Sequence, residues 1–372
     1  MIAAAEKARA VPLEPDGLEG FSLPREVDRL CGHEAALREF QDALQSGRMH
    51  HAWLIVGPEG VGKATLAYRF ARAVLAEGER GDVRHGIDRD HPVFRKVSAL
   101  SHPNFLLIRR SWVDKSKRYS QWIGVEEVRR LRSFLGHSAG EGGWRVVIVD
   151  RADELNQSAA NALLKALEEP PPKTLFLLIS SAEGRLPVTI RSRARTLRVT
   201  GLGKEDLEQA VGGALERDGH EIDGKTLAMA LDLSEGSVRR ALELVSNGGI
   251  ELYREILAAL GDLPEIESLR LHRLVDRLAG TSDSQRFDLY LALLLGLIER
   301  LIRLTATDAG GTPEEQRLAR RLLSAANLAD WAKAWESISE AKSEAQALNL
   351  DRGLLLLETW FRLQHLAREH PV

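Results

Sequence analysis

The stretch Ala52–Thr65, AWLIVGPEGVGKAT, constrains the fold of this chain more than any other part of the sequence. Its apolar start predicts a buried strand, and a helix is expected to begin at Ala64, after a glycine-rich loop. Gly57, Gly62 and Lys63 match most of the phosphate-binding loop pattern, in which glycines let backbone N–H groups turn toward phosphate oxygens. The following helix directs the positive end of its dipole at the same anion. The stretch therefore predicts a phosphate-binding strand, loop and helix.

One metal ligand of this pattern is missing. The pattern continues with Ser or Thr, whose hydroxyl ligates Mg²⁺, but this chain has Ala64 there and Thr65 one residue later. A helical residue one step further on points about 100° away, so Thr65 is a poor substitute. Two interpretations stay open. The loop binds ATP or ADP with Mg²⁺ in spite of the missing hydroxyl, or it is a glycine-rich turn that holds no nucleotide.

Composition limits the class of protein. A length of 372 residues predicts two or three domains. The 51 basic and 54 acidic residues give a net charge of −3, so global charge offers no argument for nucleic acid. The single cysteine, Cys31, excludes an internal disulfide and a zinc site of several cysteines. Because residues 1–17 are charged throughout and the apolar run 289–298 is too short to span a bilayer, we expect a cytoplasmic protein without secretory signal or membrane segment.

A second apolar strand ends in an acid. Residues 145–150, RVVIVD, have the form of a Walker B strand, and a strand buried on both faces is typical of a parallel sheet covered by helices. Asp150 stands where an open α/β sheet places ligand chemistry. An active hydrolase of this class usually has a second acid next, but here the residue is Arg151, and Asp153 and Glu154 are expected out of position. With Ala64, this predicts a nucleotide-binding fold that has lost turnover.

The pattern of strands and helices predicts four segments. We expect an extended arm over residues 1–24, an α/β domain over 25–200, a small domain of three short helices over 201–249, and an all-helical domain over 250–372. The expected strands cover residues 52–56, 105–108, 145–150, 174–179 and 196–199. The expected helices of the last domain cover residues 252–260, 266–278, 287–304, 314–326, 329–348 and 352–369. Several of these helices carry more leucine than one small bundle needs, which indicates an oligomeric interface.

Two stretches of the α/β domain give weaker signals. Residues 77–103 are charged and punctuated by Gly and Pro, which predicts an irregular excursion. Residues 109–122, RRSWVDKSKRYSQW, mix basic and aromatic side chains, which is typical either of a nucleic-acid or partner surface or of a solvated loop with aromatics packed beneath. The weak candidates for DNA contact are Arg109, Arg110, Lys115 and Lys117.

Four motifs, in this order, resemble the AAA+ clamp-loader subunits, and among them the delta-prime type of bacterial DNA polymerase III. They are GPEGVGKATLAYRFA, VVIVDRADELNQSAANALLKALEEPPPKTLFLLISS, LPVTIRSRA and EGSVRRAL. The resemblance covers residues 25–250 well and the last third only as an all-helical collar. It implies a P-loop (AAA+) domain with a parallel sheet, a helical lid and a collar that holds a ring of subunits. It also implies partners: ATPase motor and delta-type subunits, a sliding clamp and primer–template DNA.

The resemblance implies a set of nucleotide-binding residues in which Ser181 is near the sensor position and Arg239 is the lid arginine called sensor 2. Arg239 and its neighbour Arg240 are expected as an exposed basic pair at a helix start. The family often carries a four-cysteine zinc module after the P-loop helix, but residues 77–103 occupy that place without cysteine, so no zinc is expected. The full set is Gly57, Gly60, Gly62, Lys63, Ala64, Thr65, Asp150, Ser181 and Arg239.

Arg193 is implied as a catalytic residue in trans. It stands in Ser192-Arg193-Ala194, where the family has Ser-Arg-Cys, and the family's arginine projects into a neighbour's ATP site. An arginine finger of this kind accelerates phosphoryl transfer roughly 10³–10⁵-fold because its planar, permanently charged fork meets phosphate oxygens. The simpler interpretation is that Arg193 pairs with a local carboxylate.

The predicted function is therefore a clamp-loader subunit that hydrolyses ATP weakly or not at all and supplies Arg193 to its neighbour. The alternative is an active, motor-type ATPase, which needs Thr65 or water to replace the missing hydroxyl and another acid to replace Arg151. A third possibility is a scaffold that binds no nucleotide. A Holliday-junction-type motor is disfavoured, because winged helices are expected at its end in place of a long collar.

Overall fold

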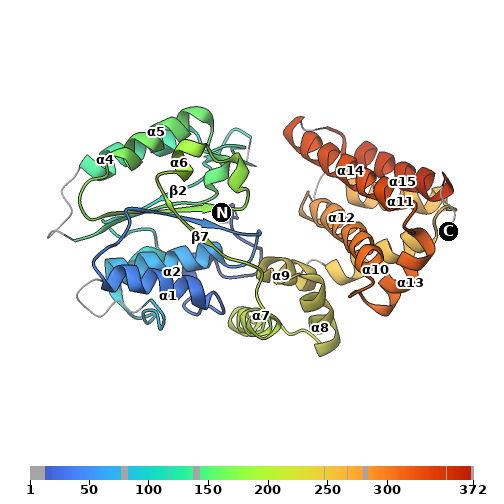
Figure 1. Cartoon of the computed structure of the whole chain (residues 1–372), viewed down its shortest axis with the longest axis horizontal. Coiled ribbons are helices and arrows are strands. Elements are labelled where there is room, and N and C mark those ends of the chain that lie inside the picture. Colours follow the sequence, from blue (N-terminus) through green and yellow to red (C-terminus); the bar gives the residue numbers. More distant parts are fainter. Residues whose placement is uncertain are drawn as a thin grey trace, which may run out of the picture. The chain divides into compact units, whose positions relative to one another are not determined.

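The computed structural model describes residues 13–76, 83–116, 118–136, 143–246, 248–265, 267–279, 284–348 and 350–369. The chain forms two compact units, Met1–Leu242 and Glu243–Val372 (Figure 1). The division falls within helix α9 (Val238–Ser246). The finer division into arm, α/β domain, lid and collar stays a prediction.

The first unit is built on a five-stranded parallel sheet. Its strand order is β2-β5-β6-β1-β7, and each neighbouring pair runs parallel. The five predicted strands are confirmed, each within one residue. Because the strands are parallel, the residues that follow them emerge at one edge, where α/β folds place ligands. The strands are β1 (Ala52–Val56), β2 (Phe105–Ile108), β5 (Arg145–Val149), β6 (Thr174–Ser180) and β7 (Arg195–Arg198).

Helices cover both faces of the sheet (Figure 1). Alternate strand residues point to opposite faces, so Trp53 and Ile55 pack under one helical layer while Leu54 and Val56 pack under the other. This two-sided burial explains why the strand sequences are apolar throughout. The first layer contains α1 (Glu34–Gln45), α2 (Lys63–Leu75) and α3 (Pro92–Ser98), and the second contains α4 (Val125–Gly136), α5 (Gln157–Glu168) and α6 (Val188–Arg191).

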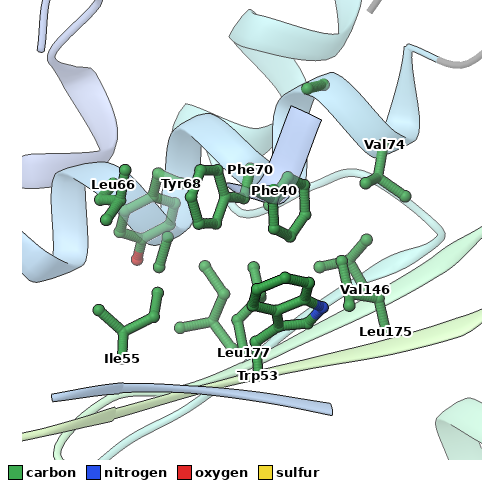
Figure 2. Close-up of a cluster of buried hydrophobic side chains, with 14 of the residues drawn as sticks. Phe40, Trp53, Ile55, Leu66, Tyr68, Phe70, Val74, Val146, Leu175 and Leu177 are labelled. Atoms are coloured by element: carbon green, nitrogen blue, oxygen red, sulfur yellow. The ribbon is translucent and has the colours of Figure 1, made fainter. Parts of the chain in front are cut away.

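An aromatic cluster fixes α1 and α2 on β1 (Figure 2). The ring of Phe40 stacks on Phe70 with 3.8 Å between centroids, and it lies 5.1 Å from the ring of Trp53. All three side chains are fully buried, and burial of each stabilises the fold by about 1.5–3 kcal/mol. The loop between β1 and α2 is therefore held between two rigid, buried elements.

Two predictions for the α/β domain are wrong in part. The stretch 77–103, expected to be irregular, contains α3, which begins at Pro92, where the missing N–H needs no partner. The buried side chains of Phe94 and Val97 hold α3 against the domain, whereas residues 77–82 lie outside the described residues. The stretch 109–122, for which a solvated loop was one of two interpretations, contains an antiparallel pair of short strands, β3 (Trp112–Val113) and β4 (Arg118–Tyr119).

Three helices follow the sheet, as predicted. They are α7 (Lys204–Asp218), α8 (Gly224–Leu233) and α9. The carboxylate of Asp223 caps α8 by accepting hydrogen bonds from the backbone N–H groups of Lys225 and Thr226. Short 3₁₀ turns lie elsewhere in this unit: η1 (Pro24–Glu26), η3 (Ala152–Glu154) and η4 (Glu183–Arg185).

The second unit is helical in its described residues, and the predicted helices are confirmed with ends that differ by up to four residues. Its core contains the fully buried side chains of Tyr290, Trp331 and Trp360. None of the described helices is both long and apolar enough to cross a membrane. The helices are α10 (Gly249–Gly261), α11 (Ser268–Ala279), α12 (Ser284–Thr307), α13 (Pro313–Leu322), α14 (Leu328–Leu348) and α15 (Arg352–Glu369).

Candidate functional site

A cavity of about 640 Å³ lies at the edge of the sheet where the strands end. It is lined by the loop after β1, the start of α2, the residues after β5 and β6, the start of α9 and the N-terminal segment. The structure thus brings together eight of the nine predicted nucleotide-binding residues. They are Gly60, Gly62, Lys63, Ala64, Thr65, Asp150, Ser181 and Arg239.

The glycines of the loop are required by close packing. A Cβ on Gly57 would lie 2.2 Å from the carbonyl oxygen of Val199, so this position has no room for a side chain. Gly60 has a φ of +78°, and a Cβ there would lie 2.2 Å from Oγ of Ser237. Gly62, with a φ of +102°, precedes the first turn of α2. The loop is therefore shaped for backbone contact with a ligand and for contact with α9.

Lys63 is buried at the floor of the cavity, with 6% of its surface exposed. Its Nζ donates hydrogen bonds to the carbonyl oxygens of Gly57 (2.8 Å) and Pro58 (2.5 Å) and to Oγ of Ser181 (2.9 Å). Burial lowers the pKa of Lys63 to about 8, although nearby acids partly oppose this effect. The ammonium group is thus held at the loop and would gain from an anion beside it.

Asp150 follows β5 and is 8% exposed. Burial, and next the charge of Asp16, raise the pKa of Asp150 to about 7. A divalent cation at this carboxylate would relieve both effects. Ala64 lines the same cavity without a hydroxyl, and Thr65 also lines it. The donor set thus fits Mg²⁺ with one hydroxyl ligand fewer than the full pattern.

The charged residues that follow Asp150 form contacts with other parts of the protein. Arg151 forms ion pairs with Glu59 of the loop (3.3 Å) and with Glu154 (2.9 Å). Asp153 accepts a hydrogen bond from the backbone N–H of Ser181 at 3.2 Å. An arginine therefore stands where a hydrolase needs a carboxylate, and the next two acids hold the site together.

Helix α9 docks directly on the loop. Oγ of Ser237 donates to the carbonyl of Glu59 at 3.0 Å, and the backbone N–H of Arg239 donates to the carbonyl of Gly60 at 3.2 Å. The expectation that Arg239 and Arg240 are exposed is wrong, because both are half-buried and Arg239 lines the cavity. A contact between the lid and the loop accounts for this difference.

The N-terminal segment is the part of the site that sequence reasoning missed. Residues 13–24, expected to be an extended arm, fold back so that Asp16, Leu18 and Phe21 line the cavity. The ring of Phe21 stacks on His220 at 4.4 Å. The nearest sequence signal is the group of turn residues Pro15, Gly17 and Gly20 between acids, but these predict a turn and not its place.

Arg193 lies outside the residues that line the cavity. Its Nη2 is 2.8 Å from Oε1 of Glu168, and its Nη1 donates to the carbonyl of Thr189 at 3.0 Å. The side chain is 36% exposed. Pairing with a local carboxylate is therefore what this chain shows by itself, and the role in trans stays a prediction.

Two of the basic residues of 109–122 form ion pairs. Arg109 pairs with Glu14 and Asp16, and Arg110 pairs with Glu154. Lys115 is exposed, and residue 117 lies outside the described residues. Among the described side chains, no three His, Cys, Asp or Glu residues come together as a metal site.

The family model described as "DNA polymerase III, delta subunit" matches residues 32–202, which contain the loop, the acid after β5 and Arg193. Residues 32–202 form a DNA polymerase III delta-subunit-like domain. This domain contains all five strands of the sheet and the floor of the cavity. The lid helices and the second unit lie beyond its match.

Curated relatives of the chain carry several subunit names. The chain is 28% identical over 228 residues to DNA polymerase III subunit gamma of Buchnera aphidicola subsp. Schizaphis graminum (60% of this chain, 58% of the relative). It is 28% identical over 254 residues to subunit tau of Escherichia coli (67% and 38%). It is 36% identical over 164 residues to subunit delta′ of Pseudomonas aeruginosa (43% and 47%). The chain thus spans about half the length of these relatives, and their names do not single out the delta-prime type.

Solved structures give weaker similarity. A gamma subunit-related protein of DNA polymerase III from Thermotoga maritima has a TM-score of 0.40 and 19% identity, covering 90% of this chain and 100% of its own. The Thermotoga maritima RuvB Holliday junction branch migration motor has a TM-score of 0.40 and 16% identity, covering 78% and 82%. The delta-subunit-like domain is identified by its sequence match alone, because TM-scores this low do not support a structural assignment.

Proposed function

We propose that this chain is a delta-prime-type subunit of a clamp loader, a hetero-oligomer that uses ATP to place a sliding clamp on primed DNA. The delta-subunit-like domain and the relatives named gamma, tau and delta′ support this proposal. In this role the chain is a stator: it binds nucleotide but hydrolyses it weakly or not at all, and it completes the active site of a neighbouring motor subunit.

The observation that best supports the stator role is that an arginine, and not a carboxylate, follows Asp150. Hydrolysis needs a carboxylate that orients the attacking water. Arg151 stands in that place and pairs with Glu59 and Glu154, so a positive group lies where the base should be. Ala64 removes the hydroxyl ligand as well. An active, motor-type ATPase would need both losses to be compensated.

Nucleotide, ATP or ADP with Mg²⁺, would be held by the cavity's own residues. Backbone N–H groups of the Gly57–Gly62 loop and the ammonium of Lys63 would bind phosphate oxygens, and Asp150 would ligate the metal. Arg239, which lines the same cavity, would add a second cation for a γ-phosphate. The metal neutralises phosphate charge when it is bound. A zinc module forms no part of this proposal.

Arg193 would act across a subunit boundary. It follows α6, whose Val188 is 67% exposed, and an exposed apolar side chain next to an exposed arginine suits a surface that a neighbour covers. The guanidinium would meet the terminal phosphate bound by that neighbour and stabilise the charge that develops there. In the second unit, Leu354 and Phe361 of α15 are 65% and 55% exposed. Seven residues apart on one helix, they share a face that suits a collar contact with other subunits.

The partners of this proposal are motor-type and delta-type subunits, the clamp and primer–template DNA, in the cytoplasm. The test is ATP hydrolysis by the reconstituted complex with clamp and primed DNA. Arg193→Ala should leave assembly intact and slow hydrolysis at the neighbouring site by roughly 10³-fold or more, the range for arginine fingers. Arg198→Ala is the matched control, because Arg198 forms a similar exposed pair with Glu183 at 2.6 Å. Unchanged hydrolysis in a fully assembled Arg193→Ala complex would contradict the role in trans.

A further inference from the structure

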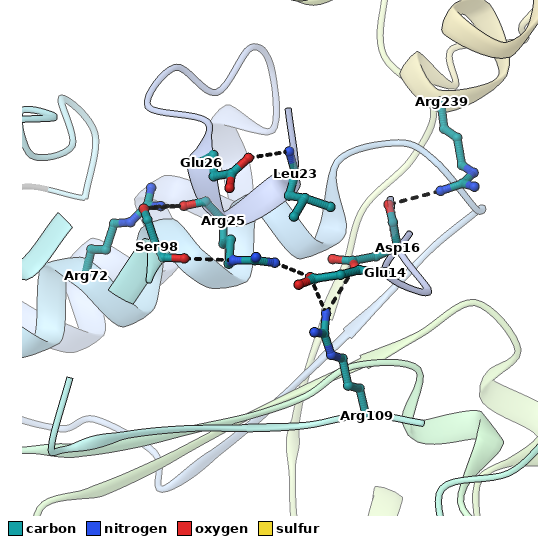
Figure 3. Close-up of polar contacts among 9 residues, drawn as sticks. All are labelled: Glu14, Asp16, Leu23, Arg25, Glu26, Arg72, Ser98, Arg109 and Arg239. Atoms are coloured by element: carbon teal, nitrogen blue, oxygen red, sulfur yellow. Dashed lines mark hydrogen bonds and ion pairs between the residues drawn. The ribbon is translucent and has the colours of Figure 1, made fainter. Parts of the chain in front are cut away.

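The N-terminal segment places Asp16 in the wall of the nucleotide cavity, and Figure 3 shows the carboxylate of Asp16 beside Arg109. The side chain of Asp16 is 12% exposed, and its Oδ1 lies 3.4 Å from Nη1 of Arg109. The same nitrogen lies 2.5 Å from Oε2 of Glu14, which also pairs with Arg25. Two acids share one arginine here, and burial raises the pKa of Asp16 in spite of Arg109, so the charge of its carboxylate is poorly compensated. Asp16 lines the cavity that Lys63 and Asp150 also line.

The same segment also binds the guanidinium of Arg239, which belongs to lid helix α9. The guanidinium of Arg239 donates to the main-chain carbonyl oxygens of Asp16 (3.1 Å) and Gly17 (3.2 Å). Figure 3 shows Arg239 reaching from α9 toward Asp16, on the other side of the segment from Arg109. A phosphate that needed Arg239 would have to take it from these two carbonyls.

Other contacts hold the segment in this place. The backbone N–H of Ser22 donates to Oδ2 of Asp218 at 3.0 Å, and a ring nitrogen of His220 lies 2.8 Å from the carbonyl of Gly20. Asp218 ends α7 and His220 follows it, so the segment is fixed to the lid as well as to Arg109 of the sheet domain. Asp16 is therefore a positioned part of the cavity wall.

The terminal phosphate is the part of a nucleotide that would meet this wall. In phosphate-binding loops of this kind the lysine reaches the β- and γ-phosphates, and a metal held by the acid after the Walker B strand would neutralise phosphate charge. Lys63 and Asp150 occupy these positions. Asp16 and Asp150 line the same cavity. A γ-phosphate would add further negative charge between them.

We propose that Asp16 is a specificity-determining residue that makes this cavity favour a nucleoside diphosphate over a triphosphate. A diphosphate keeps the contacts with the loop and Lys63 and leaves Arg239 on the segment. A triphosphate brings its terminal charge toward Asp16 and competes with the segment for Arg239. The proposal rests on the nucleotide cavity of the proposed function and is independent of Arg193.

The test is calorimetry of the full chain with ADP and with ATP, each with Mg²⁺. The ratio of the two dissociation constants is measured within one variant, so a general change in stability cancels. The wild-type chain should bind ADP more tightly than ATP. Asp16→Asn should lower the ratio Kd(ATP)/Kd(ADP) by about tenfold, a modest effect for like charges in a partly buried site. Glu19→Gln, which removes an exposed charge from the same segment, should leave the ratio unchanged.

Two further variants keep the test decisive if Asp16→Asn folds poorly. Asp16→Ser should lower the ratio as Asp16→Asn does, whereas Asp16→Glu should retain the preference for ADP. An unchanged ratio in both neutral variants, or tighter binding of ATP than ADP by the wild-type chain, would overturn the proposal. Failure of either nucleotide to bind any variant would overturn it too, yet would leave the role of Arg193 in trans standing, since that role needs only the neighbour's nucleotide.

Discussion

Arg193 and Glu168 form an ion pair at the protein surface, with 2.8 Å between Nη2 and Oε1 and with 36% and 43% of the two side chains exposed. An exposed pair of this kind contributes at most about 1 kcal/mol. A phosphate oxygen in a water-excluded subunit interface binds a guanidinium more strongly. The observed pair is therefore compatible with release of Arg193 to a neighbouring site, and Glu168 would hold the arginine until the neighbour arrives.

Glu168→Gln tests this relationship. The variant should leave ATP hydrolysis by the assembled complex unchanged or raise it by up to about fivefold, because the competing pair is worth no more than about 1 kcal/mol. The thermal midpoint of the isolated chain should hardly change. Glu169→Gln removes a neighbouring charge and serves as control. If Glu168→Gln slows hydrolysis as much as Arg193→Ala does, Glu168 positions the arginine for catalysis and is not only its partner before assembly.

The pKa of Lys63 makes nucleotide binding depend on pH. Burial lowers this pKa to about 8 from 10.5, with opposition from Glu59, Asp153 and Asp150 and support from Arg151. A phosphate beside the ammonium raises the pKa again. Between about pH 8 and 10.5 the free chain has lost the proton that the complex keeps, so binding takes up a fraction of a proton and weakens as pH rises.

Calorimetry in buffers of different ionisation enthalpy measures that uptake. At pH 7 Lys63 should take up almost no proton, and Asp150, with a pKa of about 7, should release one when Mg²⁺ binds, so net uptake should appear only by pH 8.5. Lys63→Met should weaken binding by at least about 100-fold, as expected for the loss of a charge-assisted contact in a desolvated site. Lys173→Met, at a residue remote from the cavity lining, should retain both binding and uptake. Uptake of equal size at pH 7 and 8.5 would show that another group titrates.

The regular elements of this fold could be predicted from the sequence, because each is specified locally. The strand at residues 52–56 is apolar throughout, and Asn156 caps α5 as its type and place predict. The loop of glycines and Lys63 was likewise predicted, since backbone geometry allows few residue types there. Ser181, placed near the sensor position by resemblance, does contact Lys63.

The remaining part of the site depends on contacts between distant residues. Asp16 meets Arg239 across 223 positions of sequence, and no local pattern encodes such a pair. Helix α3 was missed because only seven residues form it, too few for a clear period. Arg239 was expected at the surface because its helix start is basic, although the contact of α9 with the loop turns it inward.

Gly60→Ala should separate the lid from the loop. The new Cβ would meet Oγ of Ser237 at 2.2 Å and Cβ of Arg239 at 2.7 Å, so α9 has to move. Gly47 is the matched control, because its φ of +68° is similar and a Cβ there meets nothing within 4 Å. Gly47→Ala should therefore lower the free energy of unfolding by only about 1 kcal/mol, the cost of placing alanine in the left-handed conformation.

Hydrogen exchange distinguishes the two glycine variants. Gly60→Ala should raise exchange in peptides that cover α9 and weaken nucleotide binding. Gly47→Ala should do neither, although both variants lose some thermal stability. Equal exchange of α9 in the two variants would mean that the loop absorbs the new methyl group without moving the lid.

The second unit contains a buried ionic cluster that should make it sensitive to acid. Glu315 is 2% exposed, and its Oε1 accepts from Nε of Arg300 at 2.8 Å and from the hydroxyl of Tyr253 at 2.6 Å. Its Oε2 accepts from the backbone N–H of Thr312 at 2.7 Å, which completes the cap of α13. Burial alone raises the pKa of Glu315, but these hydrogen bonds and the charge of Arg300 outweigh it and lower the pKa.

The sign of the pH effect follows from that lowered pKa. Below pH 4.5 Glu315 binds a proton in the unfolded chain but stays ionised in the folded chain. Its contribution to the free energy of unfolding is therefore complete above pH 4.5 and is lost as the pH falls through the lowered pKa of the folded state. Glu315→Gln leaves Arg300 buried without its carboxylate and should cost about 3–5 kcal/mol in this unit. Exchange of the α13 amides should then be fast already at pH 7, whereas exposed Glu314→Gln should behave as wild type. If Glu315→Gln and wild type exchange alike at pH 7, the cluster does not hold α13 in place.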